Sequence, residues 1–375
     1  MYINESRALT ETLALQCNIA VMLWGPPGIG KSSLVHDIAN DYTLKATDPE
    51  LMKKFPQIAK MYPDGLGLVD LRCAQLDPTD LRGVPMPDKE ANVSKWYPPS
   101  FFPQNNDKWP RHGIIFLDEL EKAPTSVKNA ALQLVLDRRV GDYVVPEGWS
   151  IISAGNREED GTFSQPLGAA LENRMAHIEV ELNVDQWLAW AREHEVIDDV
   201  IGYITSREDH LYVTKEDQDG NKVRGIASRA FPSPRTWHMA SRGMSVAKSR
   251  KLQYQILASC IGREVTTDFI NWHQIFKNVN PVDIIENGNI PSDLGNKEMS
   301  FQYAVALACV FHVNKIDMLK MPHARRYTAK FLELIPNELS VVFWRNLKPK
   351  LAVPMAKDPI FDGIVSEIMS AVDDE

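Results

Sequence analysis

The sequence predicts an α/β fold of three layers, in which a mostly parallel sheet lies between two layers of helices. Short apolar runs occur at four places, and each has the length of a strand that is buried on both faces. Stretches with helical periodicity separate these runs, an alternation typical of parallel sheets with helical crossovers. The four runs are residues 19–24, 66–71, 114–117 and 149–154.

The two ends of this α/β region have their own patterns. Apolar side chains recur with helical spacing over residues 4–17, which predicts a helix before the first strand. Residues 177–182 alternate apolar and polar side chains, which predicts a last strand with one more polar face. The α/β domain is therefore expected to end near residue 183.

The rest of the chain is predicted to be mainly helical, with apolar periodicity at 252–262 and 301–315. The charged segment 216–222 predicts a solvated turn. The stretch 280–298, rich in Pro, Asn, Gly and Asp, predicts a loop or a joint between subdomains. We therefore expect an α/β domain at 1–183, a helical domain at 184–280 and a C-terminal helical extension at 281–375.

The composition is that of an ordinary globular protein, with 44% hydrophobic and 24% charged residues. Its four cysteines are far apart and form no CxxC pair, which argues against a disulfide framework or a zinc site. No apolar run approaches the ~18 residues that span a bilayer. The first residues do not resemble a signal peptide. These features predict a cytoplasmic protein.

The net charge of −9 has the wrong sign for a protein whose main partner is a phosphate backbone. A locally basic pore would still be compatible with this charge. The composition therefore disfavours nucleic acid as the partner without excluding it.

Residues 25–32, Gly-Pro-Pro-Gly-Ile-Gly-Lys-Ser, match the phosphate-binding pattern GxxxxGK[ST] and lie between a buried strand and a helix. Glycines let backbone N–H groups turn toward phosphates, and the helix N-terminus adds partial positive charge. Lys31 is expected to reach the β- and γ-phosphates of ATP, and the Ser32 hydroxyl to ligate Mg²⁺. A plain tight turn is the disfavoured alternative. The predicted nucleotide-binding residues here are Gly25, Pro26, Pro27, Gly28, Ile29, Gly30, Lys31, Ser32 and Ser33.

Two carboxylates, Asp118 and Glu119, follow the apolar run 114–117. Acids at the carboxyl end of a parallel strand lie where ligands bind in open α/β sheets. Asp118 is expected to hold Mg²⁺ and contact the nucleotide site, and Glu119 to polarise the water that attacks the γ-phosphate. Taken alone, such a pair is equally compatible with a cap for the next helix. The phosphate-binding loop favours the catalytic interpretation.

With these motifs in this order, the chain resembles the AAA+ superfamily over about residues 8–250, and within it the MoxR-like branch. The resemblance implies strand order 5-1-4-3-2 and a helical lid after the α/β core. Asn156 matches the polar residue called sensor 1, which helps to place the attacking water. Arg174, in Leu-Glu-Asn-Arg, resembles the arginine finger that reaches the neighbouring subunit's site. Arg235, in Phe-Pro-Ser-Pro-Arg-Thr-Trp, resembles the sensor-2 residue that contacts the nucleotide from the lid.

Further segments are similar to the MoxR-like branch in particular. Residues 75–85 match a segment that follows the second strand, and about 84–112 correspond to an insertion in helix 2 that faces a central pore. Residues 138–146 resemble the hairpin before sensor 1, with its turn near Gly141-Asp142. The chain departs from the family at Met175, where an aromatic residue usually follows the finger arginine.

Each single-residue assignment has a simpler alternative. An Asn at a strand end is commonly a turn residue, and an Arg near a helix end is commonly a surface charge. The order and spacing of Asn156, Arg174 and Arg235 behind the phosphate-binding loop favour the functional interpretation. For Arg82, Arg138 and Arg139 surface charge is the better interpretation. The aromatic segment 96–102 could grip a polypeptide in a pore, but a cover for the sheet edge is favoured.

The resemblance implies a Mg-dependent ATPase that works as a ring, by analogy a hexamer. Such proteins act as chaperone-like remodellers, often beside a partner with a von Willebrand factor A domain. A nucleic-acid motor or loader is the alternative, and a slow nucleotide-gated scaffold is a third possibility. The negative net charge of the chain favours a protein partner over a nucleic acid.

Overall fold

The computed structural model describes residues 1–90, 92–157, 160, 166–216, 222–224 and 230–366. The chain forms two compact units, and the boundary between them first falls within helix α8 (Val184–Glu193). Residues 217–221 of the predicted turn lie outside the described residues. The first unit comprises Met1–Trp187 and Thr214–Ile226, and the second Leu188–Val213 and Ala227–Glu375.

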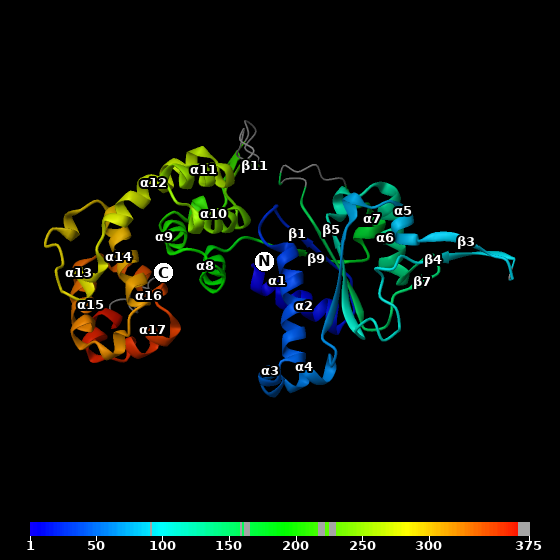
Figure 1. Ribbon diagram of the computed structural model, residues 1–375, viewed down its shortest axis with the longest axis horizontal. Helices are drawn as coiled ribbons and strands as arrows, with labels where there is room; N and C mark the ends of the chain where they lie inside the picture. The colour runs from blue at the N-terminus through cyan, green and yellow to red at the C-terminus, as the bar shows by residue number, and fades with distance from the viewer. Residues whose placement is uncertain (91, 158–159, 161–165, 217–221, 225–229, 367–375) are drawn as a thin grey trace. The chain divides into compact units, whose positions relative to one another are not determined.

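A five-stranded parallel sheet forms the centre of the first unit (Figure 1). Its strands are β1 (Val21–Trp24), β2 (Leu66–Arg72), β5 (His112–Asp118), β8 (Trp149–Gly155) and β9 (Ala176–Glu179). Their order is β2-β5-β8-β1-β9, and every neighbouring pair is parallel. This confirms the predicted α/β fold, since the order is the expected 5-1-4-3-2. The four apolar runs became the first four of these strands in chain order.

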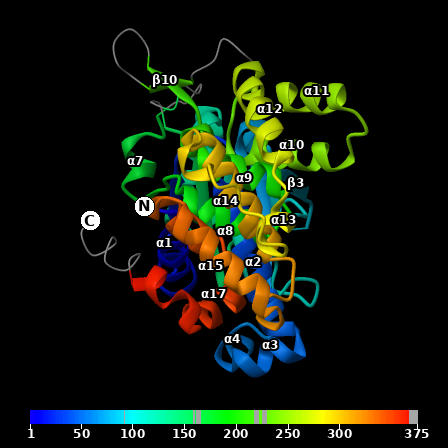
Figure 2. The same cartoon turned by 90° about the vertical axis from the view of Figure 1, so that its left-hand side faces the viewer.

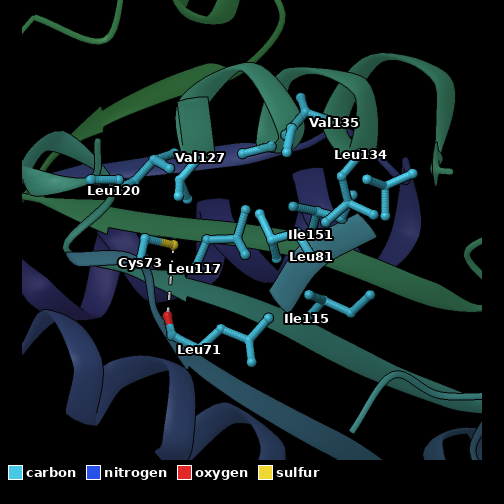
Figure 3. Close-up of a cluster of buried hydrophobic side chains, with 14 of the residues drawn as sticks. Leu71, Cys73, Leu81, Ile115, Leu117, Leu120, Val127, Leu134, Val135 and Ile151 are labelled. Atoms are coloured by element: carbon cyan, nitrogen blue, oxygen red, sulfur yellow. Dashed lines mark hydrogen bonds between the residues drawn. The ribbon is translucent and has the colours of Figure 1, made fainter. Parts of the chain in front are cut away.

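Helices cover both faces of the sheet, as a three-layer fold requires. On one face lies α2 (Lys31–Thr47), whose His36 forms a hydrogen bond of 3.0 Å with Asp70 of β2. On the other face lies α6 (Thr125–Asp137), which presents Val127 and Leu134 to the sheet (Figure 3). Successive strand residues point to opposite faces, so Leu117 joins the α6 core.

Short helices fill the connections of this unit. Helices α3 and α4 pack against α2 and against each other, and they lie together in both views (Figures 1 and 2). A proline occupies the first turn of each, where its missing N–H is not needed. The remaining helical elements of the unit are α1 (Ile3–Thr10), a π-helix (Glu11–Gln16), α3 (Pro49–Lys54), α4 (Pro56–Met61), 3₁₀ turns at Cys73–Gln75 and Leu120–Lys122, α5 (Pro78–Arg82) and α7 (Ala169–Glu172).

Two hairpins interrupt the α/β alternation. Strands β3 (Val84–Asp88) and β4 (Val93–Tyr97) pair antiparallel within the predicted insertion, and Figure 1 shows them projecting from this unit. Strands β6 (Arg139–Val140) and β7 (Tyr143–Val144) form the second hairpin, whose turn is Gly141-Asp142 as predicted. The Asp142 carboxylate accepts a hydrogen bond of 2.7 Å from the Trp96 backbone N–H, so the two hairpins are joined.

A third small antiparallel pair, β10 (Thr214–Glu216) and β11 (Lys222–Arg224), also belongs to the first unit by its contacts. It flanks the predicted charged turn. The pair is inserted in the chain between helices of the second unit, so the chain passes from one unit to the other more than once.

The second unit is helical. Helix α14 is buried over most of its length and contacts α9, α12, α13 and α16 (Figure 2). Among the described residues, no helix is long and apolar enough to cross a membrane. The helices of the unit are α9 (Asp198–Ser206), α10 (Pro234–Val246), α11 (Arg250–Ile261), α12 (Arg263–Asn278), α13 (Pro281–Ile285), α14 (Met299–Val313), α15 (Pro322–Leu334), α16 (Asn337–Arg345) and α17 (Pro349–Ala356).

Aromatic side chains form the core where α9, α10 and α12 meet. The Tyr203 ring lies 5.6 Å from Trp237, 5.0 Å from Phe269 and 5.6 Å from Trp272, between ring centroids. A core of this kind buries a large apolar area in few residues. The boundary that the sequence predicts at residue 280, between a lid and an extension, stays a prediction.

The stretch 280–298 contains α13, so the prediction of a loop there was partly wrong. Asn280 is the N-cap of α13, and its side chain accepts a hydrogen bond from the Asp283 N–H. Pro281 occupies the first helical position, which suits its fixed φ and missing N–H. The first two residues of this Pro- and Asn-rich stretch are therefore the start of a helix.

Candidate active site

The loop at residues 25–30 connects β1 to α2 at the carboxyl edge of the sheet. Gly30 is the N-cap of α2 with φ 112°, a backbone conformation that favours glycine. At Gly25, with φ 153°, an added Cβ would lie 2.6 Å from the Val180 carbonyl oxygen, so a side chain there would collide with the chain beyond β9. Within this loop Ile29 is buried, whereas Pro26, Pro27 and Gly28 are half-buried.

Lys31 is the first residue of α2 and is only 8% exposed. Its ammonium donates hydrogen bonds to the carbonyl oxygens of Gly25 at 2.6 Å and Pro26 at 3.0 Å. It also donates to Asn156 Oδ1 at 2.9 Å, across 125 residues of sequence. The Lys31 ammonium thus connects the loop to the residue that follows β8 through hydrogen bonds.

Ser32 and Asp118 lie side by side at the same edge. The Ser32 hydroxyl donates to Asp118 Oδ2 at 2.9 Å, and Asp118 is 7% exposed. A hydroxyl and a carboxylate are the hard oxygen donors that suit Mg²⁺, which takes its other ligands from water and phosphates. No cluster of three or more His, Cys, Asp or Glu that could hold a metal occurs in the part of the chain that the structure describes. Ser33, the next residue of α2, is exposed.

Glu119 follows β5 in a left-handed conformation with φ 55° and ψ 38°. Non-glycine residues rarely adopt this region, and such strain is concentrated at functional sites. Its backbone N–H donates to Asp118 Oδ1 at 2.9 Å, which stabilises the turn. Its carboxylate is 35% exposed and lies 2.9 Å from the Lys122 ammonium. Glu119 is therefore accessible, whereas Asp118 is buried.

Asn156 completes the group at the end of β8. It is 7% exposed, and its amide Nδ2 donates to Glu121 Oε1 at 3.1 Å. The structure thus brings together five of the predicted residues from three strand ends: Lys31, Ser32, Asp118, Glu119 and Asn156.

The sequence of this part of the chain matches a known protein family. The family "ATPase family associated with various cellular activities (AAA)" matches residues 21–178, which run from β1 into β9. The chain contains an AAA ATPase domain. No curated protein matches the sequence.

Solved structures with distant similarity are numerous. NtrX from Brucella abortus is 12% identical, with a TM-score of 0.31, over 95% of this chain and 68% of that one. A candidate ATPase from Cytophaga hutchinsonii is 11% identical, with a TM-score of 0.30, over 98% and 92%. A mutant of RuvB from Thermotoga maritima is 16% identical, with a TM-score of 0.34, over 84% of each chain.

One residue of this AAA domain, Glu121, is not among the residues predicted from the sequence, and it is 1% exposed. Burial raises the pKa of its carboxyl group, while the hydrogen bond from Asn156 and the charges of Lys122 and Lys31 act in the opposite direction. The feature of the sequence that could have pointed to Glu121 is that it is the third acid in Asp118-Glu119-Leu120-Glu121. Sequence alone gave no reason to place that acid inside, because charged residues are almost never fully buried unless paired.

The raised pKa of Glu121 predicts a pH-dependent effect on stability. A carboxyl group whose pKa is higher in the folded state favours folding when protonated, and this contribution is lost as pH rises through the folded pKa. Glu121→Gln is therefore expected to raise the melting temperature at about pH 8, with the gain shrinking toward about pH 4. Differential scanning fluorimetry across this range measures the effect. The exposed Glu147→Gln is the control, and a Glu121→Gln gain that is equal at all pH values would contradict the argument.

Arg174 lies just after α7 of the AAA domain and is exposed. Its guanidinium donates to the Ala170 carbonyl oxygen and forms no ion pair with any carboxylate in the described part of the chain. Met175, at the position of the usual aromatic residue, is buried in the α6 core. Arg174 is thus an exposed residue that lies next to a buried one.

Arg235 belongs to the helical unit and is described within that unit alone. It is the second residue of α10 and is exposed, while Trp237 is fully buried and donates to the His210 carbonyl oxygen at 2.8 Å. Ser233 and Thr236 form a capping box at the helix start. A cation in the first turn opposes the helix dipole, so local stability does not explain Arg235.

Arg138 has a structural role. Its guanidinium donates to Asn18 Oδ1 at 2.9 Å and to the Trp149 carbonyl oxygen. These bonds attach the β6–β7 hairpin to the amino end of β8. Arg82 and Arg139 are exposed, in line with their interpretation as surface charges.

Proposed function

We propose that the AAA domain binds Mg-ATP at residues 25–33 and hydrolyses it to ADP and phosphate. The observation that carries the proposal is the convergence of Lys31, Asp118 and Asn156 at one edge of the sheet, within hydrogen-bond distance of one another or of Ser32. A buried cation at a helix N-terminus suits phosphate binding. A buried carboxylate next to a hydroxyl suits Mg²⁺.

In this proposal Lys31 binds the β- and γ-phosphates, and Arg235 contacts the nucleotide from the helical unit. When bound at Ser32 and Asp118, Mg²⁺ neutralises phosphate charge. Glu119 accepts a proton from the attacking water. The oxygen of that water bonds to the γ-phosphorus, and the bond between the γ-phosphorus and the leaving oxygen of ADP breaks. Asn156 orients that water. The half-buried carboxylate of Glu119 is accessible to a water molecule, whereas Asp118 is buried and accepts the Ser32 hydrogen bond.

We further propose that the protein works as a ring, by analogy a hexamer of MoxR-like type. The support is Arg174, an exposed cation with no carboxylate partner among the described residues. In a ring it would reach the γ-phosphate bound by the neighbouring subunit. Movement between the two units during hydrolysis would then do mechanical work on a partner.

The proposed partner is a protein, acted on in a chaperone-like manner. The aromatic segment 96–102 divides in the structure: Phe102 is fully buried and stacks on Tyr143, with 4.5 Å between centroids, whereas Tyr97 is 60% exposed. Tyr97 pairs with Val84, and with Met86 they form a group of exposed apolar side chains on the β3–β4 hairpin, next to the ion pair of Lys95 and Asp88. Residues 84–97 carry two acids and two lysines, so the hairpin suits a polypeptide better than a phosphate backbone.

Lys31→Ala tests the nucleotide site directly. We expect ATP affinity to fall about a hundredfold or more, because a charge-assisted contact to phosphate is lost. Binding of a fluorescent ATP analogue measures the change. Lys45→Ala is the matched control, since this lysine lies on the same helix and pairs with Asp41. Equal binding by both variants would place the nucleotide elsewhere.

The partner is identified by trapping. Glu119→Gln protein is incubated with ATP and cell extract, and the proteins retained are compared with those retained by the Lys31→Ala variant. ATPase activity that rises with a retained protein, such as one with a von Willebrand factor A domain, would support remodelling. Salt-dependent DNA binding that stimulates the ATPase would favour a nucleic-acid motor instead.

A further inference from the structure

Glu121 is a buried acid that its immediate surroundings do not satisfy. Oε1 accepts a hydrogen bond from Asn156 Nδ2, but Oε2 has no hydrogen-bond partner among the described residues. A buried polar atom left unpaired costs about 1–3 kcal/mol, and more when charged. A residue retained only for packing would not carry this cost, since leucine or methionine fills a similar volume.

The neighbouring strand provides space for this carboxylate. At Gly155, the residue before Asn156, an added Cβ would lie 2.8 Å from Glu121 Oε2 and 2.5 Å from the Met22 methyl group. Any side chain at position 155 would therefore push the acid out of its place. The absence of a side chain at Gly155 and the position of Glu121 therefore depend on each other, and Glu121 is hydrogen-bonded to the next residue, Asn156.

The hydrogen bonds around Asn156 determine which way its amide points. On one side the Lys31 ammonium can only donate, so it faces the amide oxygen at 2.9 Å. On the other side an ionised Glu121 can only accept, so it faces the amide nitrogen at 3.1 Å. A flipped amide would set donor against donor and acceptor against acceptor. Both contacts therefore enforce the same orientation.

We propose that Glu121 is a positioning residue, which holds the Asn156 amide with its oxygen on the Lys31 side and thereby sets the rate of hydrolysis. The inference rests on the proposed function, because Asn156 is there the group that orients the attacking water. When Lys31 engages phosphate, its hold on the amide oxygen weakens, and the Glu121 contact alone maintains the orientation. Asn156 then presents an acceptor to the water rather than a donor.

Glu121→Leu removes the acceptor and leaves the amide free to flip. We expect kcat to fall about ten- to a hundredfold, while the affinity for a fluorescent ATP analogue stays within about twofold. Glu121→Gln keeps an acceptor at Oε1 and should retain most of the rate. Leu134→Ala is the control for lost stability, because replacing this fully buried core residue of α6 is also destabilising.

A double-mutant cycle decides whether Glu121 acts through Asn156. In the Asn156→Ala background, Glu121→Leu should change kcat by less than about twofold, because the side chain to be positioned is already absent. An independent tenfold loss in that background would overturn the proposal. So would a Glu121→Leu variant that loses ATP binding and kcat in parallel with its stability.

If the Glu121→Leu variant does not fold, a second pair of variants tests the proposal by exchanging the hydrogen-bond donor at position 156 and the acceptor at position 121. Asn156→Asp places two carboxylates in contact and should nearly abolish activity. Adding Glu121→Gln supplies an amide donor to the new carboxylate at position 156 and should restore kcat at least about tenfold. No restoration in a folded, ATP-binding double variant would overturn the proposal. A wild-type protein without Lys31-dependent ATPase activity would instead refute the proposed function itself.

Discussion

Glu119→Gln is expected to lower kcat about a thousandfold while ATP remains bound. Glutamine cannot take a proton from the attacking water, so the chemical step is lost. Binding should be kept because the Glu119 carboxylate contacts Lys122, whereas the side chains that we propose to contact phosphate and Mg²⁺ are those of Lys31, Ser32 and Asp118. Steady-state phosphate release and equilibrium binding of an ATP analogue separate the two effects.

The control for this substitution is Glu147→Gln. Glu147 is exposed and lies just before β8, at the opposite edge of the sheet. Its replacement removes the same charge from the same domain. If both glutamine variants hydrolyse ATP at the wild-type rate, Glu119 is not the base.

Arg174→Ala is expected to lower kcat about a thousandfold, because arginine fingers contribute strongly to the transition state of phosphoryl transfer. ATP binding should change little, since in the proposed ring Arg174 acts on the nucleotide of a neighbouring subunit. The comparison with Arg111→Ala isolates the position of the charge, because Arg111 is 80% exposed at the amino edge of the sheet.

Mixing the Arg174→Ala and Glu119→Gln proteins tests whether this arginine acts between subunits. In randomly mixed rings about a quarter of the interfaces combine an intact Glu119 with an intact Arg174, so about a quarter of the wild-type rate should return. Native mass spectrometry confirms that mixed rings form. An inactive mixture of mixed rings would mean that Arg174 does not act in trans.

Most strands of the sheet could be predicted from the sequence because they are largely buried on both faces. Short continuous apolar runs bounded by glycine or polar residues are distinctive, and the resemblance supplied their order. The phosphate-binding loop was equally clear, since its function depends on backbone conformation that local glycines determine. These features are local, so they can be recognised in a single segment.

Tertiary relations were harder to predict. The contact of Lys31 with Asn156 crosses 125 residues, and the sequence suggested it only through family resemblance. Glu121 was missed because burial of an acid depends on a gap in another strand, at Gly155. The helix α13 was missed because Asn280-Pro281 begins helices as well as turns.

The hydrogen bond from the Trp96 backbone N–H to the Asp142 carboxylate connects the projecting β3–β4 hairpin to the β6–β7 hairpin. Asp142 lies in the turn of the β6–β7 hairpin, which Arg138 fastens to the amino end of β8. The other end of β8 carries Asn156. The carboxyl end of β8 thus leads to Asn156, which we propose orients the attacking water, and its amino end is bonded to the hairpin that holds β3 and β4. A displacement of β8 along its own axis would therefore move both regions.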